Sequence, residues 1–171
     1  NVIFAVDGSG SMQYHKRAVE SVLNALASPL KNSAQTTRVS LYTFNAQINC
    51  SFLSRHPDAL SNFQFHPNGG TALIDASIRA INDHKGIKEG VDEDNTYLLY
   101  VITDGEENQS RNRASDLKQL IASLDDSWTV ATLVPDLTGG SNAKACGFPA
   151  GNIERWNVSD AKGFEDVGHK M

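Results

Sequence analysis

The chain has 171 residues and a formal net charge of −5. This length fits one ordinary domain, which buries roughly 70% of the surface that its unfolded chain would expose. The acidic balance argues against a nucleic-acid partner, because binding to phosphates rests mostly on cationic side chains. No apolar stretch approaches the ~20 residues that span a membrane, so we predict no direct membrane insertion.

The sequence is expected to be a single domain over residues 1–171, cut from a longer protein. An apolar run begins at residue 2, and no signal peptide precedes it. Cys50 and Cys146 are too few for a disulfide framework, and we expect them near opposite edges of the fold as free thiols. Free thiols favour a reducing, cytoplasmic compartment, but a cell-surface or extracellular location within a larger protein stays open.

The first predicted elements are a strand, a helix and a hairpin. Residues 2–6 form a continuous apolar run that ends at Asp-Gly, the pattern of a buried strand. From Met12 to Leu30 apolar residues recur at steps of three and four, which predicts a helix that ends near Pro29. Residues 39–44 and 48–52 alternate in polarity with few residues between them, so the second of these strands is expected to be an antiparallel edge.

Strands and helices then alternate to the end of the chain. We expect a helix from near Thr71, a strand over 97–103 and a helix over 117–124, followed by a strand over 128–134 and a short strand over 153–156. This alternation is typical of a parallel sheet covered on both faces. The predicted fold class is therefore α/β: a doubly wound, mostly parallel six-stranded sheet with one antiparallel edge strand and helices on both faces.

Two aspartates follow strands that are neighbours in such a sheet. Asp7 follows the strand over 2–6, and Asp104 follows the strand over 97–103. In a doubly wound sheet these strands meet where the strand order reverses, which is where such sheets bind ligands. We expect both carboxylates to lie side by side there, outside the buried runs. Two such carboxylates repel each other unless a proton or a metal ion compensates.

Hydroxyl groups are predicted around both carboxylates. The segment Asp-Gly-Ser-Gly-Ser carries Ser9 and Ser11, and Thr71 follows Asn-Gly-Gly at a helix start. Three hydroxyls and two carboxylates, without Cys or His, are hard oxygen ligands that suit Mg²⁺, Mn²⁺ or Ca²⁺ and disfavour zinc. A divalent ion would cancel both carboxylates and, with waters completing its octahedron, keep one position open to an outside anion.

Together these segments resemble the metal-ion-dependent adhesion site of von Willebrand factor type A (vWA) domains. The resemblance implies that the two serines, with the threonine in some states, bind the metal directly, and that the aspartates bind it directly or through water. It implies metal-dependent protein-protein interaction rather than catalysis, in adhesion or complex assembly, with a partner's Glu or Asp carboxylate as the last metal ligand. The matching segments are Asp7-x-Ser9-x-Ser11, Gly-Gly-Thr71 and Thr103-Asp104-Gly105.

Many members of this family shift their last helix when the metal site changes state. Here residues 159–171 contain two glycines and no clear apolar stripe. We therefore do not assume such a switch in this chain, and whether one regulates affinity stays open.

Several residues near the predicted site have two interpretations. Asp75, one helical turn after Thr71, either orients a hydroxyl or a water, or is a first-turn aspartate that the helix dipole favours. The segment Glu106-Glu107-Asn108 either shapes the rim that faces the partner or is a solvated acidic loop. The five histidines lack ligand spacing, so a second metal site is not expected.

Other functions are alternatives. Phosphatases with an aspartate nucleophile also carry that aspartate directly after the first strand of an α/β fold. In this chain Ser9 occupies the place of their general acid, and a serine cannot supply the proton at neutral pH. A serine hydrolase needs Gly-x-Ser-x-Gly, and Asp7 stands where its first glycine would be. The chain has no Gly-Lys-Ser/Thr element of a phosphate-binding loop. A structural vWA domain whose metal only stabilises the fold stays open.

Overall fold

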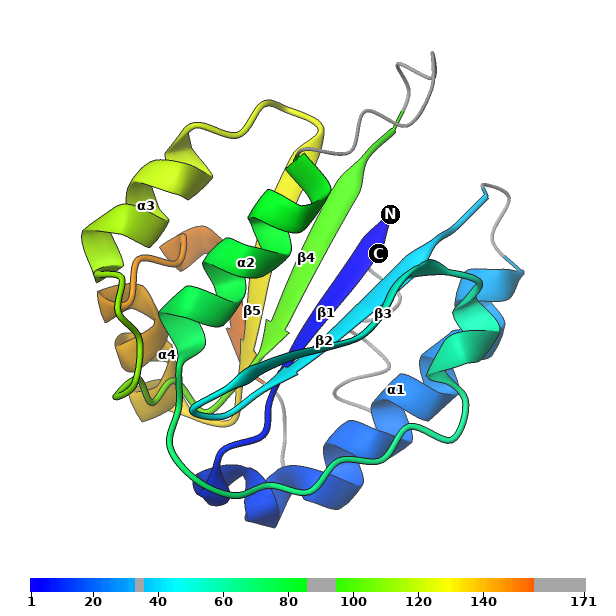
Figure 1. The fold of residues 1–171 in the computed structure, drawn as a ribbon, viewed down its shortest axis with the longest axis horizontal. Helices are drawn as coiled ribbons and strands as arrows, with labels where there is room; N and C mark the ends of the chain where they lie inside the picture. The colour runs from blue at the N-terminus through cyan, green and yellow to red at the C-terminus, as the bar shows by residue number, and fades with distance from the viewer. Residues whose placement is uncertain (33–35, 86–94, 156–171) are drawn as a thin grey trace.

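The computed structural model describes residues 1–32, 36–85 and 95–155. The strands are β1 (Val2–Asp7), β2 (Val39–Phe44), β3 (Ile48–Arg55), β4 (Tyr97–Ile102), β5 (Trp128–Val134) and β6 (Ile153–Arg155). They form one sheet in the order β3-β2-β1-β4-β5-β6 (Figure 1). Every neighbouring pair is parallel except β2 and β3. The predicted sheet, with its antiparallel edge strand, is confirmed.

Helices cover both faces of the sheet. Successive side chains of a strand point to opposite faces, so Phe4 packs with α1 on one face, whereas Ile3 packs with the other helices on the opposite face. Both residues are essentially fully buried, which explains why β1 is apolar throughout. The α-helices are α1 (Lys16–Lys31), α2 (Leu73–Lys85), α3 (Ala114–Ala122) and α4 (Leu137–Ala145), and the 3₁₀ helices are η1 (Gly10–His15), η2 (Pro57–Leu60) and η3 (Ala150–Asn152).

The predicted helices differ from the observed ones in detail. The helix expected from Met12 begins as η1 and becomes α-helical only at Lys16, and Pro29 lies inside its last turns rather than ending it. Helix α4 is absent from the prediction. Residue 156, the expected end of the sixth strand, and the tail over 159–171 lie outside the described residues.

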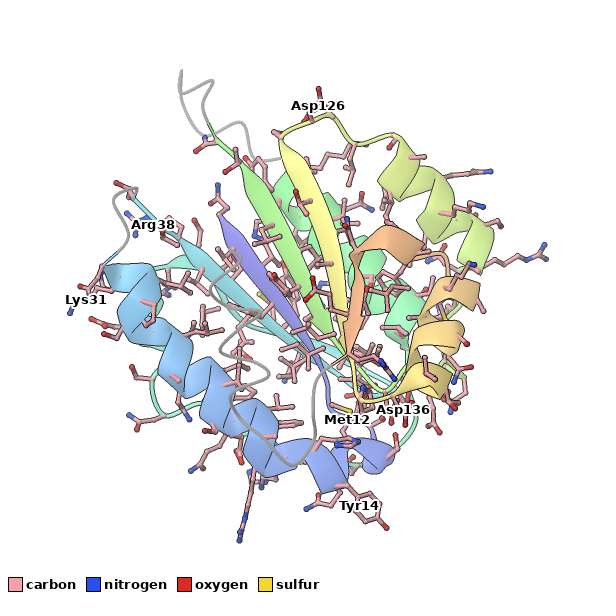
Figure 2. The ribbon with its side chains drawn as sticks, turned by 180° about the vertical axis from the view of Figure 1, so that it is seen from behind. Met12, Tyr14, Lys31, Arg38, Asp126 and Asp136 are labelled. Atoms are coloured by element: carbon pink, nitrogen blue, oxygen red, sulfur yellow. The ribbon has the colours of Figure 1, made fainter. Side chains whose placement is uncertain are left out.

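The carboxyl ends of β1, β4 and β5 lie at one end of the molecule. The chain leaves β1 towards β2 on one side and reaches β4 on the other, so the strand order reverses between β1 and β4. Figure 2 shows Met12, Tyr14 and Asp136 at this end and Asp126 and Arg38 at the opposite one.

Two further findings bear on the predictions. Cys50 in β3 and Cys146 after α4 are both free thiols, as expected. No helix within the described ranges has the length and apolar character needed to cross a membrane.

Candidate metal centre

Asp7 is the last residue of β1, and its side chain is completely buried. One carboxylate oxygen accepts a hydrogen bond from the Ser9 amide at 2.8 Å, and the other accepts one from the Thr103 hydroxyl at 2.7 Å. The expectation that Asp7 lies outside the buried runs is wrong, because the carboxylate turns inward between β1 and the end of β4. Its orientation is therefore fixed by the segments that follow β1 and β4.

Asp104, Ser9 and Ser11 meet next to Asp7. The Ser9 and Ser11 hydroxyl oxygens lie 3.1 Å apart, and the Ser11 hydroxyl donates to one Asp104 carboxylate oxygen. The other Asp104 oxygen accepts the amide of Glu106 at 3.1 Å, and a Glu106 oxygen lies 3.3 Å from the Ser11 hydroxyl. Four of the five predicted site residues thus form one connected cluster.

Thr71 reaches this cluster through the backbone of its loop. The amide of Gly10 donates to the carbonyl of Gly69 at 3.1 Å, and the amide of Asn68 donates to the carbonyl of Gly8 at 2.8 Å. These two bonds join the Asn-Gly-Gly-Thr loop to the Asp-Gly-Ser-Gly-Ser loop. The Thr71 side chain is completely buried, and within the described residues its hydroxyl has no hydrogen-bond partner.

Comparisons with known proteins agree with this geometry. The family model of the von Willebrand factor type A domain matches residues 1–136. The chain belongs to the vWA domain family. A comparison with curated protein sequences gives no match.

Solved structures with the same fold have low sequence identity to this vWA domain. BatB from Bacteroides thetaiotaomicron is 18% identical, with a TM-score of 0.69 over 99% of this chain and 95% of that one. Proximal thread matrix protein 1 from the mussel byssus, solved with a zinc-occupied MIDAS motif, is 14% identical, with a TM-score of 0.70 over 98% of this chain and 44% of that one. The pilus adhesin SpaC from Lactobacillus rhamnosus GG is 14% identical, with a TM-score of 0.69 over 99% and 29%. The domain therefore spans less than half of the thread protein and of the adhesin.

Without a cation, the two neighbouring carboxyls of the vWA site favour binding of a proton. Burial raises the pKa of Asp7 to about 7, and the nearby charge of Asp104 adds to the rise. The hydrogen bonds from Ser9 and Thr103 lower the pKa but do not offset the effect of burial. Asp7 therefore holds a proton readily when no metal is bound. This is the compensation that two adjacent carboxylates require.

The residues present fit a divalent cation. A buried hydroxyl without a partner costs about 1–3 kcal/mol, and a cation at the site would give the Thr71 oxygen a bond that the described residues do not supply. Among the described residues no group of three or more His, Cys, Asp or Glu side chains could hold a metal. A cation held by Asp7 and Asp104 would therefore need hydroxyls to complete its ligands, which suits a hard ion.

The segment over 107–112 clasps the start of α2, and we call it the α2 clasp. One Glu107 carboxylate oxygen accepts the Ile74 amide at 2.9 Å, and the other accepts the Gln109 and Ser110 amides at 3.0 Å. The Asn108 side chain accepts the Thr71 amide at 2.8 Å. The clasp follows Asp104 closely in sequence, so it ties the loop of one predicted ligand to the loop of another.

Asp75 completes the α2 clasp from the helix side. Its carboxylate accepts the amides of Arg111 and Asn112 at 2.7 and 3.0 Å. Burial raises the pKa of Asp75, but the hydrogen bonds from Arg111 and Asn112 outweigh burial and hold the pKa below its usual value. Neither sequence interpretation of Asp75 anticipated this partner. Glu107 likewise holds backbone amides rather than facing solvent, whereas Glu106 is exposed.

We expect Glu107→Ala to weaken Mg²⁺ binding by about 10- to 100-fold, the usual loss when a group that orients metal ligands is removed. The substitution leaves the amides of Ile74 and Ser110 without this acceptor, whereas the Gln109 amide keeps the Thr71 carbonyl at 2.9 Å, so the Thr71 loop loses part of its support. Isothermal titration of the variant with MgCl₂ measures the effect, and Asp126→Ala at the opposite end of the molecule is the control. An unchanged Mg²⁺ affinity together with a lower melting temperature would show that the clasp only stabilises α2.

Proposed function

We propose that this vWA domain mediates metal-dependent protein-protein interaction, in adhesion or in complex assembly. The bound ion is Mg²⁺ or Mn²⁺, and it coordinates a Glu or Asp carboxylate of the partner protein. The observation that carries the proposal is the convergence of two carboxylates and two serine hydroxyls, next to the loop of Thr71, whose buried hydroxyl has no hydrogen-bond partner among the described residues. The proposed metal ligands are Asp7, Ser9, Ser11, Thr71 and Asp104.

Each residue has a role that its position supports. The hydrogen bonds from Ser9 and Thr103 fix the orientation of the Asp7 carboxylate, so it is held ready to supply a negative charge to the ion once its proton has left. Asp104 and Ser11 are only partly buried and lie at the mouth of the site, where they border the position that faces a partner. A divalent ion cancels the two carboxylates, and a hard ion favours an anionic oxygen over a neutral one for its last ligand.

We propose binding rather than catalysis. The residue two positions after Asp7 is Ser9, and its hydroxyl lies against the Ser11 hydroxyl. A serine hydroxyl is not a general acid at neutral pH, so a phosphatase mechanism lacks its proton donor. The pilus adhesin among the structural neighbours is in keeping with a binding role. A metal that only stabilises the fold is the remaining alternative, and the experiment below distinguishes it.

The test is partner capture from a lysate in MgCl₂ and in chelator, followed by titration of the purified partner. Binding is expected to vanish in chelator and to return with Mg²⁺ or Mn²⁺, and less fully with Ca²⁺, whose longer bonds suit a compact site poorly. The titration is also made with Zn²⁺, because a zinc ion occupies the metal-ion-dependent adhesion site (MIDAS) of the mussel protein.

A second step maps the acid on the partner. Each Glu and Asp of the mapped epitope is changed in turn to its amide, and one change is expected to lower affinity at least about 30-fold, which is about 2 kcal/mol. Full affinity in chelator, or an epitope without an essential acid, contradicts the metal bridge. A melting temperature that depends on Mg²⁺ while partner binding does not would instead support a structural metal.

A further inference from the structure

A hollow of about 440 Å³ opens on the surface immediately after the predicted metal loop, and we call it the η1 hollow. It is lined by Gln13, Tyr14, Lys16, Arg17 and Glu20. The Tyr14 side chain is 90% exposed, and Figure 2 shows it projecting from the end of the molecule at which Met12 and Asp136 lie. An aromatic ring held in solvent beside a binding site is typical of a contact surface.

The η1 hollow is positively charged. Within the ranges that the structure describes, neither Lys16 nor Arg17 forms an ion pair. The acid that lines the hollow, Glu20, has a carboxylate oxygen that accepts the Phe65 amide at 3.2 Å. Both cations are therefore available to an acid from outside.

Acidic side chains also lie close to the metal site. Glu106 is exposed and reaches Ser11. Asp136 is exposed at the start of α4, and the charges of Asp104 and Asp136 both act on His15, so the two acids lie near the end of η1. A partner that brings a carboxylate to the metal thus meets like charge from Glu106 and Asp136, and opposite charge only from the cations of the hollow.

We propose that the η1 hollow binds a second acidic residue of the same partner, so that the domain recognises a diacidic segment. The inference rests on the proposed function, because the first acid is the one on the metal. Lys16 and Arg17 pair with the second acid, and the Tyr14 ring covers the chain between the two.

The geometry sets the spacing of the two acids. A 3₁₀ helix rises by about 2 Å per residue, so Arg17 stands roughly 11 Å along the chain from Ser11. An extended peptide advances about 3.3 Å per residue. The second acid is therefore expected about three or four positions from the first.

The probes for the test are fluorescent Ser/Gly peptides with either one Glu or two Glu residues at separations of one to seven positions. Their affinity is measured in MgCl₂ and in chelator. In MgCl₂ the pair separated by three or four positions is expected to bind about 2- to 5-fold tighter than the single-Glu peptide, the gain typical of exposed charge pairs. High salt should reduce this gain, because it screens exposed charges.

Variants separate the hollow from the metal. The double variant K16Q/R17Q is expected to abolish the advantage of the two-Glu peptide and to leave single-Glu binding unchanged. The control Arg38→Gln removes an exposed cation at the opposite end of the molecule and should retain the advantage. An advantage that is independent of spacing, or that survives K16Q/R17Q, overturns the inference.

The two proposals fail in different ways. If two-Glu binding persists in chelator but is lost in K16Q/R17Q, the hollow binds acids and the metal bridge is wrong. If single-Glu peptides bind only with Mg²⁺ and a second Glu adds nothing, the metal bridge stands and the diacidic preference is wrong. If no peptide binds differently in MgCl₂ and in chelator and none depends on Lys16 or Arg17, both proposals fall.

Discussion

Replacing Asp104 with asparagine is expected to lower Mg²⁺ affinity by about 100-fold or more, a loss of about 2.7 kcal/mol. The charge on its ligands sets how tightly a hard cation is held, and this change removes one of the two carboxylates. The amide can still accept the Glu106 backbone hydrogen bond that Asp104 accepts now. Isothermal titration with MgCl₂ at neutral pH measures the loss.

The same variant should keep its fold. Without metal, Asp104→Asn removes a charge that lies close to Asp7, so its melting temperature in chelator is expected to be no lower than that of the wild type. With Mg²⁺ at a hundredfold excess over its dissociation constant, the wild type should gain about 2.7 kcal/mol of stability, and the variant should gain far less.

Asp126→Asn is the matched control for this experiment. It makes the same change of charge at an exposed position at the opposite end of the molecule. Wild-type affinity in Asp104→Asn would remove Asp104 from the ligand set. A clear drop in its melting temperature in chelator would show instead that Asp104 holds the structure by hydrogen bonds.

The fold could be predicted because its strands carry one simple signal. β1 and β4 are largely buried on both faces and are therefore apolar nearly throughout, and an Asp-Gly pair marks the end of β1 and the turn that follows β4. Helix α4 carries no such signal, since Gly139 and Gly140 stand in its first turns. Its position is set by packing: a Cβ atom at Gly139 would lie 2.9 Å from the Asp104 carbonyl oxygen. Only the folded structure shows this contact.

The sequence predicted which side chains would lie together at the candidate site, but not the groups that hold their loops in place. Asp7, Ser9 and Ser11 are close in sequence, and strand order brings Asp104 beside them. Glu107 accepts an amide from the first turn of α2, and Asp75 accepts amides from the loop after β4. An acidic side chain in a sequence does not reveal which distant amides it will meet. At Gly70 a Cβ atom would lie 2.8 Å from an Asn108 side-chain oxygen. The need for glycine at this position can be recognised only when the positions of both loops are known.

Protons and metal are expected to compete for Asp7. Because burial raises the pKa of this carboxyl to about 7, the metal must displace a proton at any lower pH. Mg²⁺ affinity should therefore fall by about 50-fold between pH 7 and pH 5, approaching tenfold for each pH unit at the acid end, and should level off above pH 8. Titrations in two buffers with different ionisation enthalpies should show about one proton released per ion at pH 6 and almost none at pH 8.

The stability of the metal-free domain should change in the opposite sense. A carboxyl whose pKa is higher in the folded state than its ordinary 3.8 binds its proton more tightly when folded, so folding is favoured as the pH falls from about 7 towards 4 and is disfavoured as the pH rises through that window. Asp7→Asn is the control, because it cannot titrate and its side-chain oxygen can still accept a hydrogen bond. The difference in unfolding free energy between wild type and Asp7→Asn, measured by denaturant titration in chelator from pH 4 to pH 8, should move against the wild type as the pH rises. A difference that does not vary with pH, together with Mg²⁺ binding that releases no proton at pH 6, would show that Asp7 is already ionised in the metal-free domain.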